Sequence, residues 1–358
     1  MGDPTTGSGR TLADHFRRLI AATGPISLAR FMGESNARYY AGKDPLGAAG
    51  DFITAPEISQ MFGELAGLWL ADIWTRTGRP DGAFYAELGP GRGTLARDAL
   101  RAMGRVGLEP PVHLVEGSPA LAALQRQAVP QARFPADLAE VPMEGPILLL
   151  ANEFLDALPV RQLVKTGPGW REVMVALDDS GQFTLVAGGL PMDAAVPEAR
   201  RGAEDGTVIE TCPAAAAIVA EVAGRLARQG GAALFIDYGH TAARTGSTLQ
   251  AIRAHTKVDP LALPGEADLT AHVDFATLAE IASAHGARWL GTVEQGAWLR
   301  ALGLEARAEA LARAAPDQRE AIGRAVERLA GAEQMGRLFK VMALVGPGWP
   351  GGAGFPAP

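Results

Sequence analysis

Apolar runs of strand length alternate with helix-spaced apolar positions in the middle of the chain. Three such runs, at 84–88, 112–116 and 147–151, are separated by segments in which apolar residues recur at helical spacing. This alternation predicts parallel strands joined by helices. A fourth run, at 232–238, follows only after a long gap. We therefore expect an α/β fold with a doubly wound parallel sheet.

The long gap predicts an insertion, because one crossover helix does not need so long a connection. Short strand patterns at 162–164, 170–177 and 183–187 surround turns rich in glycine and aspartate, which favours an antiparallel β-rich insertion. After it we expect helices at 214–228, 274–285 and within 298–329, and strands at 288–293 and 338–345. The resulting divisions are a helical N-terminal region and lid at 11–80, the first part of the sheet domain at 81–158, an inserted substrate-side region at 159–211, the second part with helical insertions at 212–345, and a disordered tail at 346–358.

A glycine-rich turn follows the first strand. Glu87 closes the strand, and Gly89, Gly91 and Gly93 come at alternate positions. A dinucleotide fingerprint requires glycine where this chain has Thr94. An acid two positions before a G-x-G-x-G turn is instead typical of S-adenosylmethionine (SAM) methyltransferases. A glycine turn without a ligand remains the alternative.

Composition narrows the function classes. The 358 residues carry a net charge of −7 without a basic run, which argues against nucleic-acid binding. Cys212 is the single cysteine, so no internal disulfide or cysteine cluster can form, and we expect a reducing, cytoplasmic setting. Apolar runs are too short to cross a bilayer, and the first residues do not resemble a signal peptide.

Acidic residues at two further strand ends could complete a nucleoside site. Glu116, followed by Gly117 and Ser118, lies where an acid can accept hydrogen bonds from ribose hydroxyls. Asp137, followed by Leu138, could bond an adenine amino group. A solvated strand-end acid is the alternative reading of Glu116.

The third strand delivers Asn152, Glu153 and Asp156 to the sheet edge where open α/β folds bind ligands. Two carboxylates and an amide could hold a substrate amine or guanidinium, because carboxylates accept the forked guanidinium donors in pairs. We take these three as the catalytic candidates. Asn152 and Asp156 could instead cap the following turn.

Two further segments are candidates for the substrate side or a lid. Asp51, Phe52, Thr54 and Glu57 precede an apolar helix. Thr54 and Glu57 could also form a capping box.

The other candidates for the substrate side or lid are Asp237, which ends the fourth strand, and His255, which lies in a later loop. The histidines show no compact metal-ligand spacing, so we assign no metal. The chain has no G-x-S-x-G elbow, which argues against a serine hydrolase.

These blocks resemble the MidA-like methyltransferases, a SAM-dependent family that includes the mitochondrial assembly factor for respiratory complex I. The resemblance also rests on sequence blocks farther along and covers nearly the whole chain in order; its principal blocks are 50–57, 87–93, 152–159, 237–239, 246–250 with His255, 268–275 and 335–342.

The resemblance implies a class I SAM-methyltransferase fold, Rossmann-like, and methylation of protein arginine with SAM as cofactor. It makes a complex I subunit one candidate protein partner, although the lack of a mitochondrial presequence is typical of a bacterial member. We expect neither a nucleic-acid partner nor integral membrane association, and a homodimer is left open. A SAM-binding assembly chaperone without catalysis is the alternative, and an NAD-dependent oxidoreductase is a third that the glycine spacing disfavours.

Overall fold

The computed structural model describes residues 11–42, 53–253 and 256–356, which form two compact units. One unit comprises 43–157, 214–243 and 272–358 and contains the large sheet; the other comprises 1–42, 158–213 and 244–271. We call them the sheet unit and the accessory unit. The N-terminal segment predicted as one helical region is thus divided between the two units.

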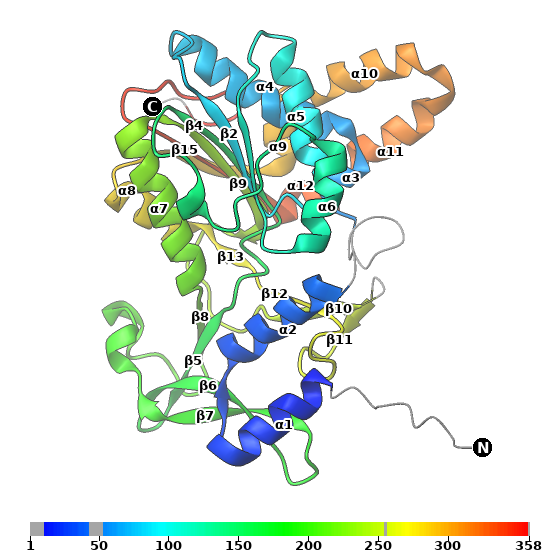
Figure 1. The fold of residues 1–358 in the computed structure, drawn as a ribbon. Coiled ribbons are helices and arrows are strands. Elements are labelled where there is room, and N and C mark those ends of the chain that lie inside the picture. Colours follow the sequence, from blue (N-terminus) through cyan, green and yellow to red (C-terminus); the bar gives the residue numbers. More distant parts are fainter. Residues whose placement is uncertain (1–10, 43–52, 254–255, 357–358) are drawn as a thin grey trace, which may run out of the picture. The chain divides into compact units, whose positions relative to one another are not determined.

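The sheet unit has strands in the order β14-β15-β9-β4-β2-β3, with β13 also paired to β9. Strands β3, β2, β4 and β9 run parallel, and β15 is antiparallel to both β9 and β14. Figure 1 shows helices on both sides of this sheet, with α7 and α8 on one side and α4 and α5 on the other. The strands are β2 Phe84–Leu88, β3 Val112–Val115, β4 Ile147–Asn152, β9 Gly231–His240, β13 Val273–Asp274, β14 Arg288–Glu294 and β15 Phe339–Val345.

This arrangement confirms the predicted doubly wound α/β fold. The central strands are buried on both faces, so they form continuous apolar runs, and this pattern made them recognisable in the sequence. The helices are α3 Ala55–Ile58, α4 Gln60–Arg76, α5 Thr94–Gly104, α6 Pro119–Ala128, α7 Pro213–Gln229, α8 Phe275–Ala284, α9 Gln295–Ala301, α10 Leu304–Ala314, α11 Arg319–Ala330 and α12 Met335–Leu338, with 3-10 turns at Leu138–Glu140 and Pro316–Gln318.

The accessory unit contains the predicted antiparallel strands together with elements that the pattern did not predict. Strands β5, β6 and β7 are the ones predicted for the insertion. Strand β8 at the end of the insertion, β1, and a three-stranded sheet of β10, β11 and β12 were not predicted. Those extra strands are two to four residues long, too short to show an alternation. The elements are α1 Leu12–Thr23, β1 Ile26–Ser27, α2 Leu28–Gly42, β5 Arg161–Thr166, β6 Gly169–Leu177, β7 Phe183–Pro191, β8 Val208–Thr211, β10 Gln250–Arg253, β11 Thr256–Val258 and β12 Asp268–Thr270, with 3-10 turns at Asp193–Ala195 and Glu198–Arg200.

Helices α4 and α5 are in close backbone contact, which fixes the start of α5. A Cβ atom added at Gly67 would lie 2.5 Å from the carbonyl oxygen of Ala99. Glycine therefore allows an approach that a larger residue would prevent. Because α5 begins at the glycine turn, this packing holds that turn in place.

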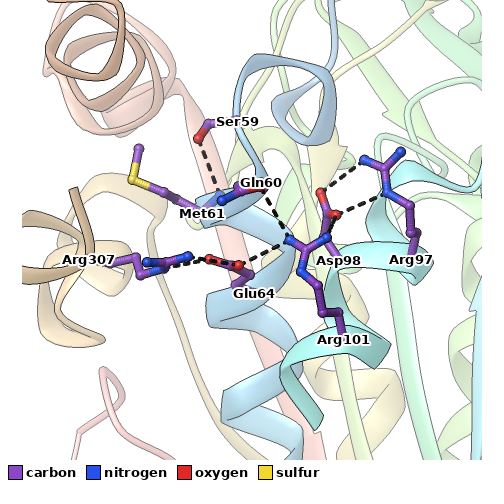
Figure 2. A network of polar contacts seen from close by, with 8 residues as sticks. All are labelled: Ser59, Gln60, Met61, Glu64, Arg97, Asp98, Arg101 and Arg307. Atoms are coloured by element: carbon purple, nitrogen blue, oxygen red, sulfur yellow. Dashed lines mark hydrogen bonds and ion pairs between the residues drawn. The ribbon is translucent and has the colours of Figure 1, made fainter. Parts of the chain in front are cut away.

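A network of buried acids and arginines also joins α4 and α5 to α10 (Figure 2). The carboxylate of Glu64, 3% exposed, accepts hydrogen bonds from Arg307 Nε at 2.6 Å and from Arg101 Nη2 at 3.0 Å. Arg101 also donates to the buried Asp98 at 2.8 Å. Burial alone would raise the pKa of Glu64, but these arginine hydrogen bonds hold it below its ordinary value. The acids are thus paired, as buried charges must be.

The C-terminal segment differs from its predicted disorder. Trp349 is only 8% exposed, the indole of Trp69 donates to the carbonyl of Ala353 at 3.0 Å, and Phe355 packs edge-on against Trp69. Glycine and proline prevent a regular helix or strand here, but they do not prevent an irregular segment from packing through its aromatic side chains.

Candidate functional site

The glycine turn connects β2 to α5 with left-handed backbone at each of its three glycines. Gly89, Gly91 and Gly93 have φ values of 62°, 54° and 79°. Side chains rarely adopt such values, so the turn depends on glycine at these positions. The N-terminus of α5, with its unpaired backbone donors, begins at Thr94 directly after the turn.

The acid before the turn is almost fully buried. Glu87 is 2% exposed and accepts a hydrogen bond from the hydroxyl of Tyr85, two residues earlier on the same face of β2. Burial raises the pKa of Glu87 to about 8, and the bond from Tyr85 acts in the opposite direction. When a cation approaches a carboxyl group buried in this way, the pKa of the carboxyl falls and the group ionises more readily.

Glu116 follows the last residue of β3 and is held by two partners. One carboxylate oxygen accepts the N–H of Ser118 at 2.7 Å, and the other accepts Nε2 of Gln125 at 3.0 Å. Burial raises the pKa of Glu116 above its ordinary value. Two carboxylate oxygens offer about four acceptor positions, so these bonds leave capacity for further donors.

Asp137 and Leu138 lie at the start of the 3-10 turn Leu138–Glu140. Asp137 caps this turn by accepting the N–H of Ala139 at 2.8 Å and is exposed, whereas Leu138 is 6% exposed. The carbonyl of Leu138 accepts Nη2 of Arg225 at 2.7 Å. The role of this pair in binding adenine stays a prediction from the sequence.

Asn152, Glu153 and Asp156 lie together where β4 ends, as predicted. The amide nitrogen of Asn152 donates to Glu153 Oε1 at 3.1 Å. Among the described residues, the buried oxygens Asn152 Oδ1 and Asp156 Oδ1 have no hydrogen-bond partner. Buried polar atoms are normally paired, so these two oxygens point to a ligand that can donate hydrogen bonds.

Glu153 has an unusual backbone conformation, with φ +49°. Residues other than glycine adopt this conformation at a cost, and such strain is frequent at functional sites. Burial, followed by the negative charge of Asp156, raises the pKa of Glu153 to about 7, and the residue as a whole is half-buried. Burial likewise raises the pKa of Asp156 to about 6, against a hydrogen bond from Tyr238.

The glycine turn and this loop are in direct contact. A Cβ atom added at Gly89 would lie 2.6 Å from Cδ2 of Phe154, between Glu153 and Asp156. Strands β2 and β4 are neighbours, and Leu88 pairs with Ala151, so both segments leave the sheet at the same edge. The tertiary structure therefore joins the two strongest sequence motifs.

Asp237, on β9, bonds to the backbone of the loop that follows β4, and its predicted substrate-side role stays a prediction. It is 1% exposed, and one of its carboxylate oxygens accepts the N–H groups of Phe154, Leu155 and Asp156 at 3.2, 3.0 and 3.2 Å. The other accepts the N–H of Tyr238. Burial and the nearby acids raise the pKa of Asp237, while these backbone donors oppose that rise.

The described part of the predicted lid contacts both motifs. Thr54 is the N-cap of α3, but its side chain makes no capping hydrogen bond, so the capping-box alternative is not formed. The carboxylate of Glu57 instead accepts the hydroxyl of Thr94 at 2.5 Å, and the N–H of Ala55 donates to Glu153 at 3.0 Å. Asp51, Phe52 and His255 lie outside the described residues.

Sequence reasoning missed Tyr85, Gln125 and Phe154. The two-residue spacing of Tyr85 and Glu87 on one strand face could have indicated the first. Gln125 lies on α6, and nothing in the local pattern distinguishes it from a solvent-facing residue. Its burial depends on how α6 packs against the turn.

The strand order, the glycine turn and the polar loop together define a Rossmann-like methyltransferase fold. A family model of S-adenosyl-L-methionine-dependent methyltransferases matches residues 65–293. The chain belongs to this family.

Similar proteins extend over nearly the whole chain. The mouse protein named protein arginine methyltransferase NDUFAF7, mitochondrial, is 37% identical over 92% of this chain and 83% of its own length. Its Drosophila melanogaster homolog is 38% identical over 93% of this chain and 84% of its own length. A crystal structure of a Burkholderia thailandensis protein bound to S-adenosyl-homocysteine has a TM-score of 0.83 and 31% identity, covering 96% of this chain and 93% of that one.

Among the helices in the described ranges, none has both the length and the apolar character that a membrane span requires.

Proposed function

We propose that this methyltransferase transfers the methyl group of SAM to an arginine nitrogen of a protein. The observation that carries the proposal is the pair of unpartnered buried oxygens on Asn152 and Asp156 beside Glu153. Their loop touches the glycine turn through Phe154. A guanidinium supplies several donors in one plane, which matches a set of converging acceptors. The names of the mouse and fly relatives support the same acceptor class.

For the cofactor, we propose the residues predicted from the sequence. Glu87, Gly89, Gly91 and Gly93 would hold the methionine end, because a buried carboxylate beside a helix start can receive both charges of an amino acid.

At the other end of the cofactor, Glu116 and Ser118 would hold the ribose, and Asp137 with Leu138 the adenine. When bound, SAM supplies an activated methyl group. The protein's own residues must then orient the acceptor and remove a proton from it.

In the proposed reaction, Asn152 and Asp156 orient the guanidinium and Glu153 accepts its departing proton. A nitrogen–carbon bond forms as the sulfur–carbon bond of the donor breaks, and the methylated nitrogen releases one proton. A base with a pKa near the working pH suits this task, and the pKa of Glu153 is about 7. We propose Thr54 and Glu57 as part of a lid over the site, with Asp51, Phe52, Asp237 and His255 as further substrate-side candidates.

The proposal also names an acceptor protein and a cellular compartment. A respiratory complex I subunit is the first acceptor to test, on the strength of the family resemblance. We propose the cytoplasm as the compartment, since Cys212 is the only cysteine and a disulfide within the chain is excluded.

The test combines cofactor binding with acceptor mapping. The purified protein is titrated with SAM by calorimetry. It is then incubated with methyl-labelled SAM and a cell extract from a strain that lacks this protein. We expect heat of binding and label on arginine, and we expect Glu153→Gln to bind SAM but lose the label. Label on a different residue type would refute arginine as the acceptor, and absence of SAM binding would refute the cofactor site.

Glu280→Gln is a matched control, because Glu280 is an exposed acid on α8. Normal assembly of the target complex by Glu153→Gln, without methyl transfer, would favour the chaperone alternative.

A further inference from the structure

The side chain of Gln125 connects two parts of the proposed cofactor site, the glycine turn for the methionine end and Glu116 for the ribose. Gln125 lies on α6 and is fully buried. Its Nε2 atom donates to the carbonyl of Gly91 at 2.8 Å and to Glu116 Oε2 at 3.0 Å. One side-chain amide therefore holds both the glycine turn and the acid at the end of β3.

The surrounding helix is arranged so that this amide has little freedom. The helix α6 starts at Pro119 after Ser118, whose N–H is already bound by Glu116. A Cβ atom at Gly93 would lie 3.3 Å from Cβ of Ala128 and 3.5 Å from Cα of Gln125. The backbone of α6 thus packs directly on the turn, and both of the amide's acceptors are fixed relative to it.

Charged residues near Gln125 come from the end of β3, from α6 and from the glycine turn. Glu116 faces Gln125 from the end of β3. The next residue on the helix, Arg126, stacks on Phe134 with its guanidinium carbon 4.7 Å from the ring centre. Arg92 lies within the turn against which α6 packs. Glu116 is therefore the ionisable group that any change at Gln125 affects first.

We propose that Gln125 is a positioning residue for SAM: it sets the distance and orientation between the glycine turn and Glu116. This inference rests on the proposed function, because it takes Glu116 as the ribose acid and the turn as the methionine end. The carbonyl of Gly91 and the carboxylate of Glu116 are both acceptors, and without a shared donor between them they repel each other. Loss of the amide should therefore weaken binding of a ligand that spans both ends.

The first test measures SAM affinity by calorimetry for the full chain and for Gln125→Ala. We expect SAM to bind about tenfold more weakly, the effect of one lost charge-assisted hydrogen bond. Gln295→Ala is the matched control. Gln295 is also fully buried and donates through Nε2 to one backbone carbonyl, that of Leu329 at 2.8 Å. Gln295→Ala should lower thermal stability but leave the Kd for SAM unchanged.

A second variant distinguishes positioning from general support of the fold. Gln125→Glu places a second carboxyl against Glu116, and two adjacent carboxylates cannot both ionise without repulsion. At low pH they share a proton and the bond is restored in part. The ratio of the variant's Kd to the wild-type Kd should therefore rise as the pH increases from 6 to 9. For Gln125→Ala the same ratio should stay constant.

Exchange of the two side chains supplies the decisive control. In the double variant Glu116→Gln with Gln125→Glu, two carboxyls no longer face each other, so the Kd ratio should rise less with pH than for Gln125→Glu alone, at a higher Kd because the proposed ribose acid is lost. A pH-independent ratio for Gln125→Glu, or a wild-type Kd for Gln125→Ala, would overturn the positioning role. Failure of the wild-type protein to bind SAM would overturn the proposed cofactor site itself, which separates the two results.

Discussion

At the residue scale, the site is built from acids whose protonation depends on burial. Glu87, Glu153 and Asp156 all have raised pKa values, and desolvation is the largest cause for each. Of these three acids, Glu153 is half-buried, whereas Glu87 and Asp156 are buried. A raised pKa combined with partial burial is what a group needs in order to bind a substrate cation and exchange a proton with it.

The first prediction concerns the pH dependence of methyl transfer. Because the pKa of Glu153 is raised to about 7, its carboxylate forms as the pH rises through that value, and activity should rise with it. Glu153→Gln should lower the rate about hundredfold or more and remove this rise. The measurement is the rate of label transfer at saturating SAM between pH 5.5 and 9. A Glu153→Gln profile that keeps the rise would assign it to another group.

At the scale of elements, the end of β9 positions the end of β4. Asp237 does this with a single side chain, whose carboxylate accepts four backbone N–H groups. The strained residue Glu153 comes immediately before the three loop residues whose N–H groups Asp237 accepts. The conformation of this loop thus depends on hydrogen bonds to a neighbouring strand and not on the loop sequence alone.

The second prediction follows from these bonds. In Asp237→Asn, an N–H₂ group replaces one acceptor, so at least one buried backbone donor loses its partner. We expect the free energy of unfolding to fall by about 1–3 kcal/mol, together with a lower rate of methyl transfer.

Urea unfolding and label transfer measure the two effects of Asp237→Asn. Asp274→Asn is the control, because Asp274 caps α8 by accepting from Thr277 and asparagine caps a helix equally well. Equal losses in both variants would argue against a special role for Asp237.

At the scale of the whole molecule, segments far apart in sequence complete the sheet unit. The buried acid Glu64 on α4 is paired by Arg307 on α10, and the C-terminal segment packs on Trp69 of α4. Trp349 is buried in that segment, and its carbonyl accepts a hydrogen bond from Arg288 on β14. Trp349 is therefore part of the hydrophobic core, and Phe355 packs against it.

The third prediction tests this closure. Trp349→Ala removes a large buried side chain and should lower the free energy of unfolding by about 3–5 kcal/mol. Trp289→Ala, at a side chain that is 45% exposed, should cost much less. Thermal or urea unfolding of the two variants gives the comparison. A similar small loss in both would mean that the end of the chain contributes little to stability.

The sheet, the glycine turn and the acidic strand ends could all be predicted from the chain's local pattern. Buried parallel strands must be apolar throughout, and left-handed turns require glycine, so both leave a local trace in the chain. The same local reasoning located Asn152, Glu153 and Asp156 at a strand end.

The contacts between these parts become visible in the folded molecule alone. Gln125, Asp237 and Phe154 act through contacts with residues tens of positions away, and no local pattern encodes a partner of that kind. The tail shows the same limit: its glycines and prolines excluded regular structure, as the pattern indicated. Its aromatic side chains nevertheless pack against the rest of the protein, because burial depends on the surface that the rest of the chain presents.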